Sequence, residues 1–258
     1  MNITIIGGGN LGTAIALGIT RHTQGNQVIV TRRNPETIAH LQNEKIHIFS
    51  DNPLATQNAE IVILCVKPWQ TEAVIKEIHS TLEGKVLASA VSGVSLEQLQ
   101  FWAGVGIPVM RIMPNIAVQF GESATCLSFA DAHKEHVQPL RDLFSKLGTA
   151  VVIDEKLMDA ATVLGACGTA YALRYIRASM QAGIEIGFDA QTALAIAAQT
   201  AKGAAKMALE EQVHPEQLID RVTTPQGCTI VGLNEMEHQG FSSALIQGIK
   251  TSLKKIRE

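Results

Sequence analysis

Aromatic and charged residues are both scarce in this sequence. Of its 258 residues, 4% are aromatic and 17% are charged, whereas 46% are hydrophobic. A chain with so many apolar residues can bury a sizeable core, which excludes intrinsic disorder and a collagen-like repeat. Because aromatic residues are few, the core must consist mostly of aliphatic side chains and alanine, which favours packed helices and β-branched strands.

The sequence also lacks an excess of charge of one sign and a long apolar run. Lysine and arginine together number 21 and aspartate and glutamate 24, so the net charge is −3. This balance gives no support for a general nucleic-acid-binding protein. No run of about eighteen apolar residues occurs, so no transmembrane span is expected. The glycine-interrupted N-terminal stretch lacks the basic region of a signal peptide.

Cysteine is rare, and its spacing matches no disulfide or metal motif. The four cysteines are far apart and form no C-x-x-C pair: Cys65, Cys126, Cys167 and Cys228. In a chain of this length, reduced thiols in the cytoplasm are a simpler interpretation than a disulfide framework. His133 and His136 lie close together in a polar segment, which favours a solvated helix face over a zinc site, so we expect no metal.

Short apolar runs alternate with helical patterns as far as Ile153. Strands are expected at residues 2–6, 27–31, 46–49, 60–66, 86–90, 108–112, 124–129 and 150–153. The run from Glu60 to Val66 is apolar after its first residue, as in a strand covered on both faces. Strands that alternate with helices predict an α/β fold with a Rossmann-like, doubly wound, mostly parallel sheet.

No convincing strand follows Ile153, and the second part of the chain is rich in alanine. Sixteen alanines lie between residues 160 and 208, and Asp189, Pro215 and Gly240 mark the beginnings of helices. We therefore expect a Rossmann domain at residues 1–154 and an all-α domain at residues 155–258. Alanine buries little area, so this helical domain is expected to be covered by a second subunit; a self-sufficient bundle is the alternative.

A glycine-rich segment joins the first expected strand to the first helix. Gly7, Gly9 and Gly12 form the pattern G-x-G-x-x-G, with Asn10 and Leu11 inside it. The motif is weak alone, but its strand–turn–helix context is typical of a dinucleotide site. The glycines allow a tight turn, close approach to a pyrophosphate and close helix–strand packing, and the helix start offers free N–H groups. We predict that these five residues bind the cofactor; a purely structural turn is the alternative.

The end of the second expected strand indicates which dinucleotide binds. NAD enzymes usually place Asp or Glu there to hold the ribose 2′-hydroxyl. This chain has Arg32 and Arg33 instead, and guanidinium groups bind a 2′-phosphate with charge-assisted hydrogen bonds. We therefore predict that the domain at residues 1–154 binds NADP(H) in preference to NAD(H). Two solvated arginines are the alternative.

Further loops are expected at the same edge of the sheet, because ligands of open α/β sheets bind beyond the carboxyl ends of the strands. We predict that residues of four such loops contact the cofactor: Asn52; Val66, Lys67 and Pro68; Ala90, Val91 and Ser92; and Asn115. An ordinary strand-to-helix turn is the alternative for each loop, and their shared position along one edge of the sheet favours binding.

The most polar loop of the second half is at residues 221–229, ahead of a helical pattern from Ile230 to Glu237. Its hydroxyl groups, with the free N–H groups of a helix start, suit an anion such as a carboxylate. A capped turn between two helices explains the same pattern equally well.

Taken together, these residues resemble the pyrroline-5-carboxylate reductase family over essentially the whole chain. In the first half the resemblance lies in residues 7–12, 66–68, 92–95, 111–115 and 121–122. In the second half it lies in residues 198–200, 203–206, 214–215, 222–225, 229–230 and 240–241. These later motifs are far more specific than a glycine-rich loop.

The resemblance implies an NAD(P)H-dependent oxidoreductase that reduces 1-pyrroline-5-carboxylate to L-proline, the last step of proline biosynthesis. It implies that residues 155–258 bind substrate and pair two subunits through their helices, with dimers often assembling into a decamer. It also implies that the small imine carboxylate is held by Thr224, Gly227, Cys228 and Thr229.

The chain departs from the family's usual sequence in three places. Residues 165–171 read Gly-Ala-Cys-Gly-Thr-Ala-Tyr where Ser-Gly-Ser-Gly-Pro-Ala-Tyr is usual, Gln226 stands for a glycine, and Ile116-Ala117 stands for Thr-Pro. Thr169 and Tyr171 are candidates for a polar contact with the imine nitrogen, although no residue stands out as a proton donor. Two alternatives stay open: a reductase of another imine or carbonyl acid, and a nucleotide-binding regulatory protein without turnover.

Overall fold

The computed structural model describes residues 1–257, without the side chains of residues 131–133. The chain forms two compact units. The N-terminal unit comprises Met1–Thr169 together with the last residues from Ile256, and the C-terminal unit comprises Ala170–Lys255. The division into domains at residue 154 stays a prediction.

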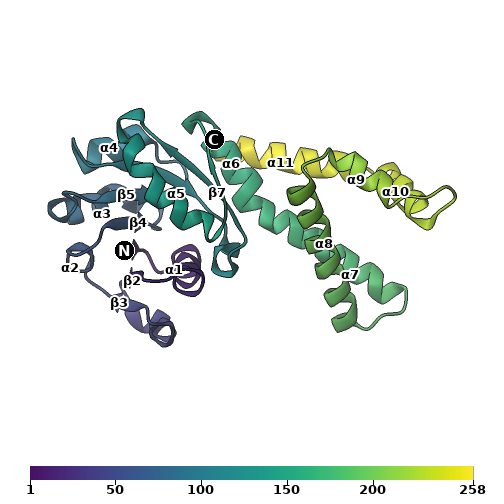
Figure 1. Cartoon of the computed structure of the whole chain (residues 1–258), viewed down its shortest axis with the longest axis horizontal. Coiled ribbons are helices and arrows are strands. Elements are labelled where there is room, and N and C mark those ends of the chain that lie inside the picture. The colour runs from purple at the N-terminus through teal and green to yellow at the C-terminus, as the bar shows by residue number, and fades with distance from the viewer. Residues whose placement is uncertain (258) are drawn as a thin grey trace. The chain divides into compact units, whose positions relative to one another are not determined.

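An eight-stranded sheet forms the centre of the N-terminal unit (Figure 1). Its strand order is β3-β2-β1-β4-β5-β6-β7-β8, and each neighbouring pair is parallel except β6 and β7. This arrangement confirms the predicted α/β fold with a doubly wound, mostly parallel sheet. The strands are β1 (Asn2–Ile6), β2 (Gln27–Thr31), β3 (His47–Phe49), β4 (Ile61–Leu64), β5 (Val86–Ser89), β6 (Val109–Met113), β7 (Ser123–Phe129) and β8 (Gly148–Val152).

Helices and short 3₁₀ segments connect these strands. The α-helices are α1 (Asn10–His22), α2 (Asn52–Thr56), α3 (Thr71–Ile78), α4 (Leu96–Ala103) and α5 (Val137–Ser145). The 3₁₀ segments are η1 (Pro35–Glu44), η2 (Pro68–Gln70), η3 (His79–Thr81), η4 (Ile116–Phe120), η5 (Asp131–His136) and η6 (Glu155–Leu157). After β8 the unit ends in α6 (Met158–Ala161) and a short π-helix, η7 (Thr162–Cys167).

Two apolar layers cover the two faces of the sheet. On one face Ile3 and Ile5 of β1 pack in a cluster with residues of α1 and α5. On the other face Ile6 of β1 packs in a cluster with residues of α3 and α4. Because side chains alternate along a strand, a strand buried on both faces must be apolar almost throughout, which explains the continuous run of β4.

A buried ion pair ties β6 to the segment that follows β8. The guanidinium of Arg111 is buried and lies 3.0 Å from Oε1 of Glu155. The same carboxylate accepts the backbone N–H of Leu96, at the start of α4, at 2.6 Å. One carboxylate therefore neutralises a buried charge and caps a helix, so its loss leaves both groups unsatisfied.

We predict that Glu155→Gln lowers the free energy of unfolding by about 1–3 kcal/mol, because the buried guanidinium of Arg111 loses its counter-charge while Glu155 itself is partly exposed. Urea denaturation measures the change. Lys156→Gln is the control, because it removes only the surface ion pair with Asp154 and should leave stability unchanged. Equal stability of the Glu155→Gln variant and the wild type would contradict the prediction.

The C-terminal unit is helical throughout, as the sequence predicts. Its helices are α7 (Gly168–Glu185), which begins in the N-terminal unit, α8 (Ala190–Glu211), α9 (Pro215–Arg221), α10 (Cys228–His238) and α11 (Phe241–Arg257), which ends there. Figure 1 shows them in green to yellow. Asp189 caps α8 by accepting the N–H groups of Gln191 and Thr192 at 3.0 Å. No helix within residues 1–257 is long and apolar enough to cross a membrane.

The helices of the C-terminal unit leave most of their large apolar side chains exposed. Within the described residues, the buried apolar side chains of this unit are Ala193, Ala197 and Leu218. The large exposed ones include Leu173, Ile184, Ile186, Phe188, Leu194, Ile196, Leu209, Val231, Leu245 and Ile246. The isolated unit thus has the thin core expected from its alanine content.

Candidate active site

The carboxyl ends of the parallel strands bring the predicted cofactor residues to one edge of the sheet. The last residues of adjacent strands are paired: Ile6 with Thr31 of β2 and with Leu64 of β4, and Leu64 with Ser89 of β5. The strand order reverses between β1 and β4, which is where open α/β sheets bind ligands. The loops that follow these strands therefore lie together, as the sequence predicts, whereas their binding roles stay predictions.

The turn after β1 is held by close backbone contacts that only glycine allows. Gly7 has a φ of +109°, and a Cβ on it would lie 2.5 Å from the carbonyl oxygen of Cys65. A Cβ on Gly12 would lie 2.1 Å from the carbonyl oxygen of Gly7. The N–H groups of Gly7 and Gly8 both donate to the carbonyl of Thr31, at 3.2 and 2.8 Å. These contacts hold the start of α1 close to the carboxyl ends of β1, β2 and β4.

Gly9 differs from these glycines because it faces open space. A Cβ on Gly9 meets no atom of the described chain within 4 Å, and its φ of −83° is accessible to any residue. Gly9 is the N-cap of α1, no side chain caps the helix, and its first turn holds no acidic residue. The first-turn N–H groups of Asn10, Leu11 and Gly12 have no intrahelical partner. The space and the free donors fit a pyrophosphate, so the residues present suit a dinucleotide.

The thiol of Cys65 lies beneath this turn. A Cβ on Gly12 would approach the Cβ of Cys65 to 3.3 Å. Desolvation raises the pKa of this thiol to about 12. The group is therefore neutral at physiological pH and places no negative charge beside the free helix start.

The two arginines after β2 are both exposed at this edge. The guanidinium of Arg32 donates to the carbonyl of Gly8, which links it to the glycine turn. Among the described residues, no carboxylate forms an ion pair with Arg32 or Arg33. Their charges are therefore available to an anionic ligand.

Asn52 lies beside these arginines but is held by protein groups. Its Oδ1 accepts the hydroxyl proton of Thr31 at 2.6 Å, and its Nδ2 donates to Glu77 at 3.0 Å. Asn52 thus joins the end of β2 to α3. Sequence patterns do not indicate the contact with Glu77, because that residue occupies an ordinary exposed position in an amphipathic helix.

The predicted cofactor residues in the loops after β4 and β5 differ in their exposure. Lys67, Pro68 and Ser92 are exposed, Val66 is half-buried, and Ala90 and Val91 are buried. The side chain of Gln70 accepts the N–H of Lys67 at 3.3 Å, which fixes the turn after β4.

Asn115 anchors the end of β6 to the π-helix η7. Its Oδ1 accepts the N–H of Ala117 at 3.0 Å, and its Nδ2 donates to the carbonyl of Gly165 at 3.2 Å. Its own N–H donates to the hydroxyl of Ser123 at 3.1 Å. The predicted cofactor residue thus positions one of the segments in which this chain departs from the family, a link that the sequence did not indicate.

The predicted substrate loop of the C-terminal unit forms a tight turn before α10. The N–H of Gly227 donates to the carbonyl of Thr224 at 2.9 Å, and Gly227 is the N-cap of α10 without a side-chain cap. Thr224, Cys228 and Thr229 are exposed. Arg221 forms an ion pair with Glu211, so its positive charge is already neutralised by a protein group. The site offers hydroxyl and free N–H groups to an anion, without an unpaired arginine of its own.

Thr169 and Tyr171 are not brought together. The hydroxyl of Thr169 lies 3.5 Å from the carbonyl of Gly165, and that of Tyr171 lies 2.7 Å from the hydroxyl of Ser252. Residues two apart on a helix do not share a face, so the two hydroxyls do not converge on one atom.

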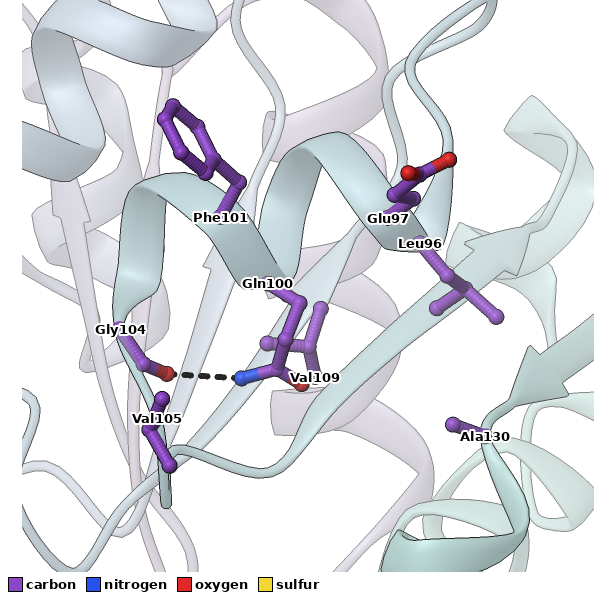
Figure 2. Close-up of a pocket in the computed structure, with 8 residues that line it drawn as sticks. All are labelled: Leu96, Glu97, Gln100, Phe101, Gly104, Val105, Val109 and Ala130. Carbon is purple, nitrogen blue, oxygen red and sulfur yellow. Dashed lines mark hydrogen bonds between the residues drawn. The ribbon is translucent and has the colours of Figure 1, made fainter.

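The described residues hold no cluster of metal ligands. The side chain of His133 lies outside them. A cavity of about 470 Å³ lies against α4, and Figure 2 shows its lining. It is apolar, with Phe101 83% exposed at its border. None of its lining residues is a predicted site residue.

Comparisons with known proteins cover both units. Residues 155–258 match the family model "Pyrroline-5-carboxylate reductase dimerisation", and residues 2–93 match "NADP oxidoreductase coenzyme F420-dependent". Pyrroline-5-carboxylate reductase 2 of Dictyostelium discoideum is 41% identical over 98% of this chain and 91% of its own length. The chain belongs to the pyrroline-5-carboxylate reductase family.

Two further similarities extend this result. Pyrroline-5-carboxylate reductase 1 of Dictyostelium discoideum is 44% identical over 98% of this chain, which spans 49% of that relative's length. The crystal structure of Plasmodium falciparum pyrroline carboxylate reductase with NADP bound matches with a TM-score of 0.86 at 25% identity. The match covers 99% of this chain and 97% of the Plasmodium chain. The family assigned from sequence motifs is therefore confirmed.

We predict that Gly9→Ala weakens NADP(H) binding at least ~10-fold without lowering the melting temperature of the free protein, because its methyl group enters open space that a pyrophosphate would fill. Calorimetric titration and thermal unfolding measure the two effects. Gly12→Ala is the matched variant: its methyl group would collide with the carbonyl of Gly7, so stability itself should fall. Unchanged affinity in Gly9→Ala would contradict the predicted pyrophosphate position.

Proposed function

We propose that this chain reduces 1-pyrroline-5-carboxylate to L-proline with NADPH, the last step of proline biosynthesis, in the cytoplasm. The observation that carries the proposal is identity of 41% and 44% to two pyrroline-5-carboxylate reductases over 98% of this chain. The glycine turn, the free start of α1 and the unpaired arginines support the cofactor part of the proposal. The four free cysteines are in keeping with a reducing compartment.

In the proposed reaction, bound NADPH supplies the hydride that is added to the C=N carbon of the substrate. The helix start at Asn10–Gly12 holds the pyrophosphate, and Arg32 and Arg33 hold the 2′-phosphate. Thr224, Thr229 and the N–H groups at the start of α10 hold the substrate carboxylate. An imine nitrogen protonated before reduction needs no acid from the protein, which agrees with the separate hydrogen bonds of Thr169 and Tyr171.

We also propose that two chains pair through the helices of the C-terminal unit. The exposed apolar side chains of this unit and the match to a dimerisation model both support pairing. A dimer would cover surface that a soluble monomer rarely leaves open. Sedimentation measures the mass of the assembly and whether dimers associate further into a decamer.

The test of the proposed activity is direct. Purified protein is mixed with 1-pyrroline-5-carboxylate and NADPH, and loss of the reduced cofactor is followed by its absorbance while L-proline is quantified. We expect equimolar consumption of NADPH and formation of L-proline. Turnover of other imine or carbonyl acids, with none of this substrate, would favour another reductase. NADPH binding without turnover across an imine panel would favour a regulatory protein.

The arginines give a prediction on cofactor preference. Arg33→Ala should raise the KM for NADPH about 10- to 100-fold, because it removes charge-assisted hydrogen bonds to the 2′-phosphate, and should leave the KM for NADH unchanged. Arg33 is the better choice, because the guanidinium of Arg32 also holds the glycine turn. Steady-state kinetics with both cofactors measures the effect. An equal loss with NADPH and NADH would reject the proposed 2′-phosphate contact.

A further inference from the structure

The turn that begins the predicted substrate loop contains a residue in an unfavourable backbone conformation. Gln226 has a φ of +60°. The hydrogen bond from Gly227 to Thr224 places Pro225 and Gln226 at the two central positions of a β-turn. A positive φ at the second central position after proline is typical of a type II turn, which strongly favours glycine there.

Within residues 1–257, two other residues with side chains have a positive φ, and their positions explain it. Lys45 and Gln212 cap the C-terminal ends of η1 and α8. The left-handed conformation is common at such helix ends. Gln226 instead immediately precedes Gly227, the N-cap of α10, so helix termination does not account for its conformation. Strained residues persist where the surrounding structure holds them in that conformation, and they cluster at ligand sites, which points to a role for Gln226.

The surroundings of Gln226 suggest what that role is. The turn holds the hydroxyl of Thr224 close to Gly227, 2.5 Å from the position that a Cβ on Gly227 would take. The next residues begin α10 without a side-chain cap, so their N–H groups are free donors. Arg221, the cation of this loop, is paired with Glu211. The carboxamide of Gln226 is exposed and is a neutral hydrogen-bond donor next in sequence to these groups, in a loop that lacks an unpaired arginine.

We propose that Gln226 is a specificity-determining residue whose carboxamide donates a hydrogen bond to the carboxylate of the substrate held by the turn at Thr224–Gly227 and the start of α10. The inference rests on the proposed function. It predicts that the side chain, and not the backbone of the turn alone, contributes to recognition of a carboxylate on the substrate ring.

Two substitutions separate the side chain from the backbone. Gln226→Glu keeps the size and conformation of the residue but removes the donor and adds a negative charge. Gln226→Gly removes the side chain and relieves the backbone strain. We expect the KM for 1-pyrroline-5-carboxylate to rise about 10-fold or more in Gln226→Gly, and further in Gln226→Glu, with kcat and the KM for NADPH within about twofold of the wild type.

Gln212→Gly is the matched control. It relieves the same left-handed conformation at another glutamine, at the end of α8. Both glycine variants should unfold at the same temperature as the wild type or at a higher one, and only Gln226→Gly should change the KM for the substrate. A KM change of equal size in Gln212→Gly would overturn the inference.

Product analogues test the carboxylate itself. Inhibition by L-proline should weaken about 10-fold in Gln226→Gly, whereas inhibition by L-prolinamide, which lacks the carboxylate, should stay within about twofold. Equal weakening for both inhibitors, or a KM in both Gln226 variants within twofold of the wild type, would overturn the inference while the proposed function stands. Absence of turnover by the wild type would overturn the proposed function and this inference with it.

Discussion

Close approach of backbone atoms at the end of β1 is the constraint on which the predicted cofactor-binding edge of the sheet depends. The carbonyl of Cys65 leaves no room for a Cβ on Gly7, and the carbonyl of Gly7 leaves none for a Cβ on Gly12. These contacts place the first turn of α1 directly over the edge where β1 and β4 end. The position of the free N–H groups therefore follows from steric exclusion, and their direction follows from the helix.

The charges around the start of α1 also favour an anion. Helix α1 begins without an acidic residue, and the thiol of Cys65 below it stays protonated. Arg32 is bound to the carbonyl of Gly8, so one positive charge is attached to the turn itself. An anion at this edge meets partial and full positive charge without a nearby carboxylate on α1 to repel it. The C-terminal loop uses a related arrangement, in which Thr224 and the start of α10 supply donors while Arg221 is occupied by Glu211.

The sequence predicts the fold well because its signals are local. A continuous apolar run such as β4 and the pattern from Gly7 to Gly12 each depend on a few adjacent residues, and the structure contains both. The sequence does not reveal how distant side chains pair. Nothing near Asn115 indicates that its amide reaches Gly165, and nothing near Asn52 indicates Glu77. The conformation of Gln226 is likewise not evident from the sequence, since a Thr-Pro-Gln-Gly segment also suits a type I turn, in which no central residue needs a positive φ.

The sparse core of the C-terminal unit has a consequence for how this protein reaches its native state. Within the described residues, a single large aliphatic side chain, Leu218, is buried among its helices. Helices of this kind gain little free energy from one another, so their stability must come from whatever covers their apolar faces. If that cover is a second chain, the helices order only as the chains meet, and dilution loosens them together with the dimer. The temperature of unfolding then rises with protein concentration by mass action, as it does for obligate dimers.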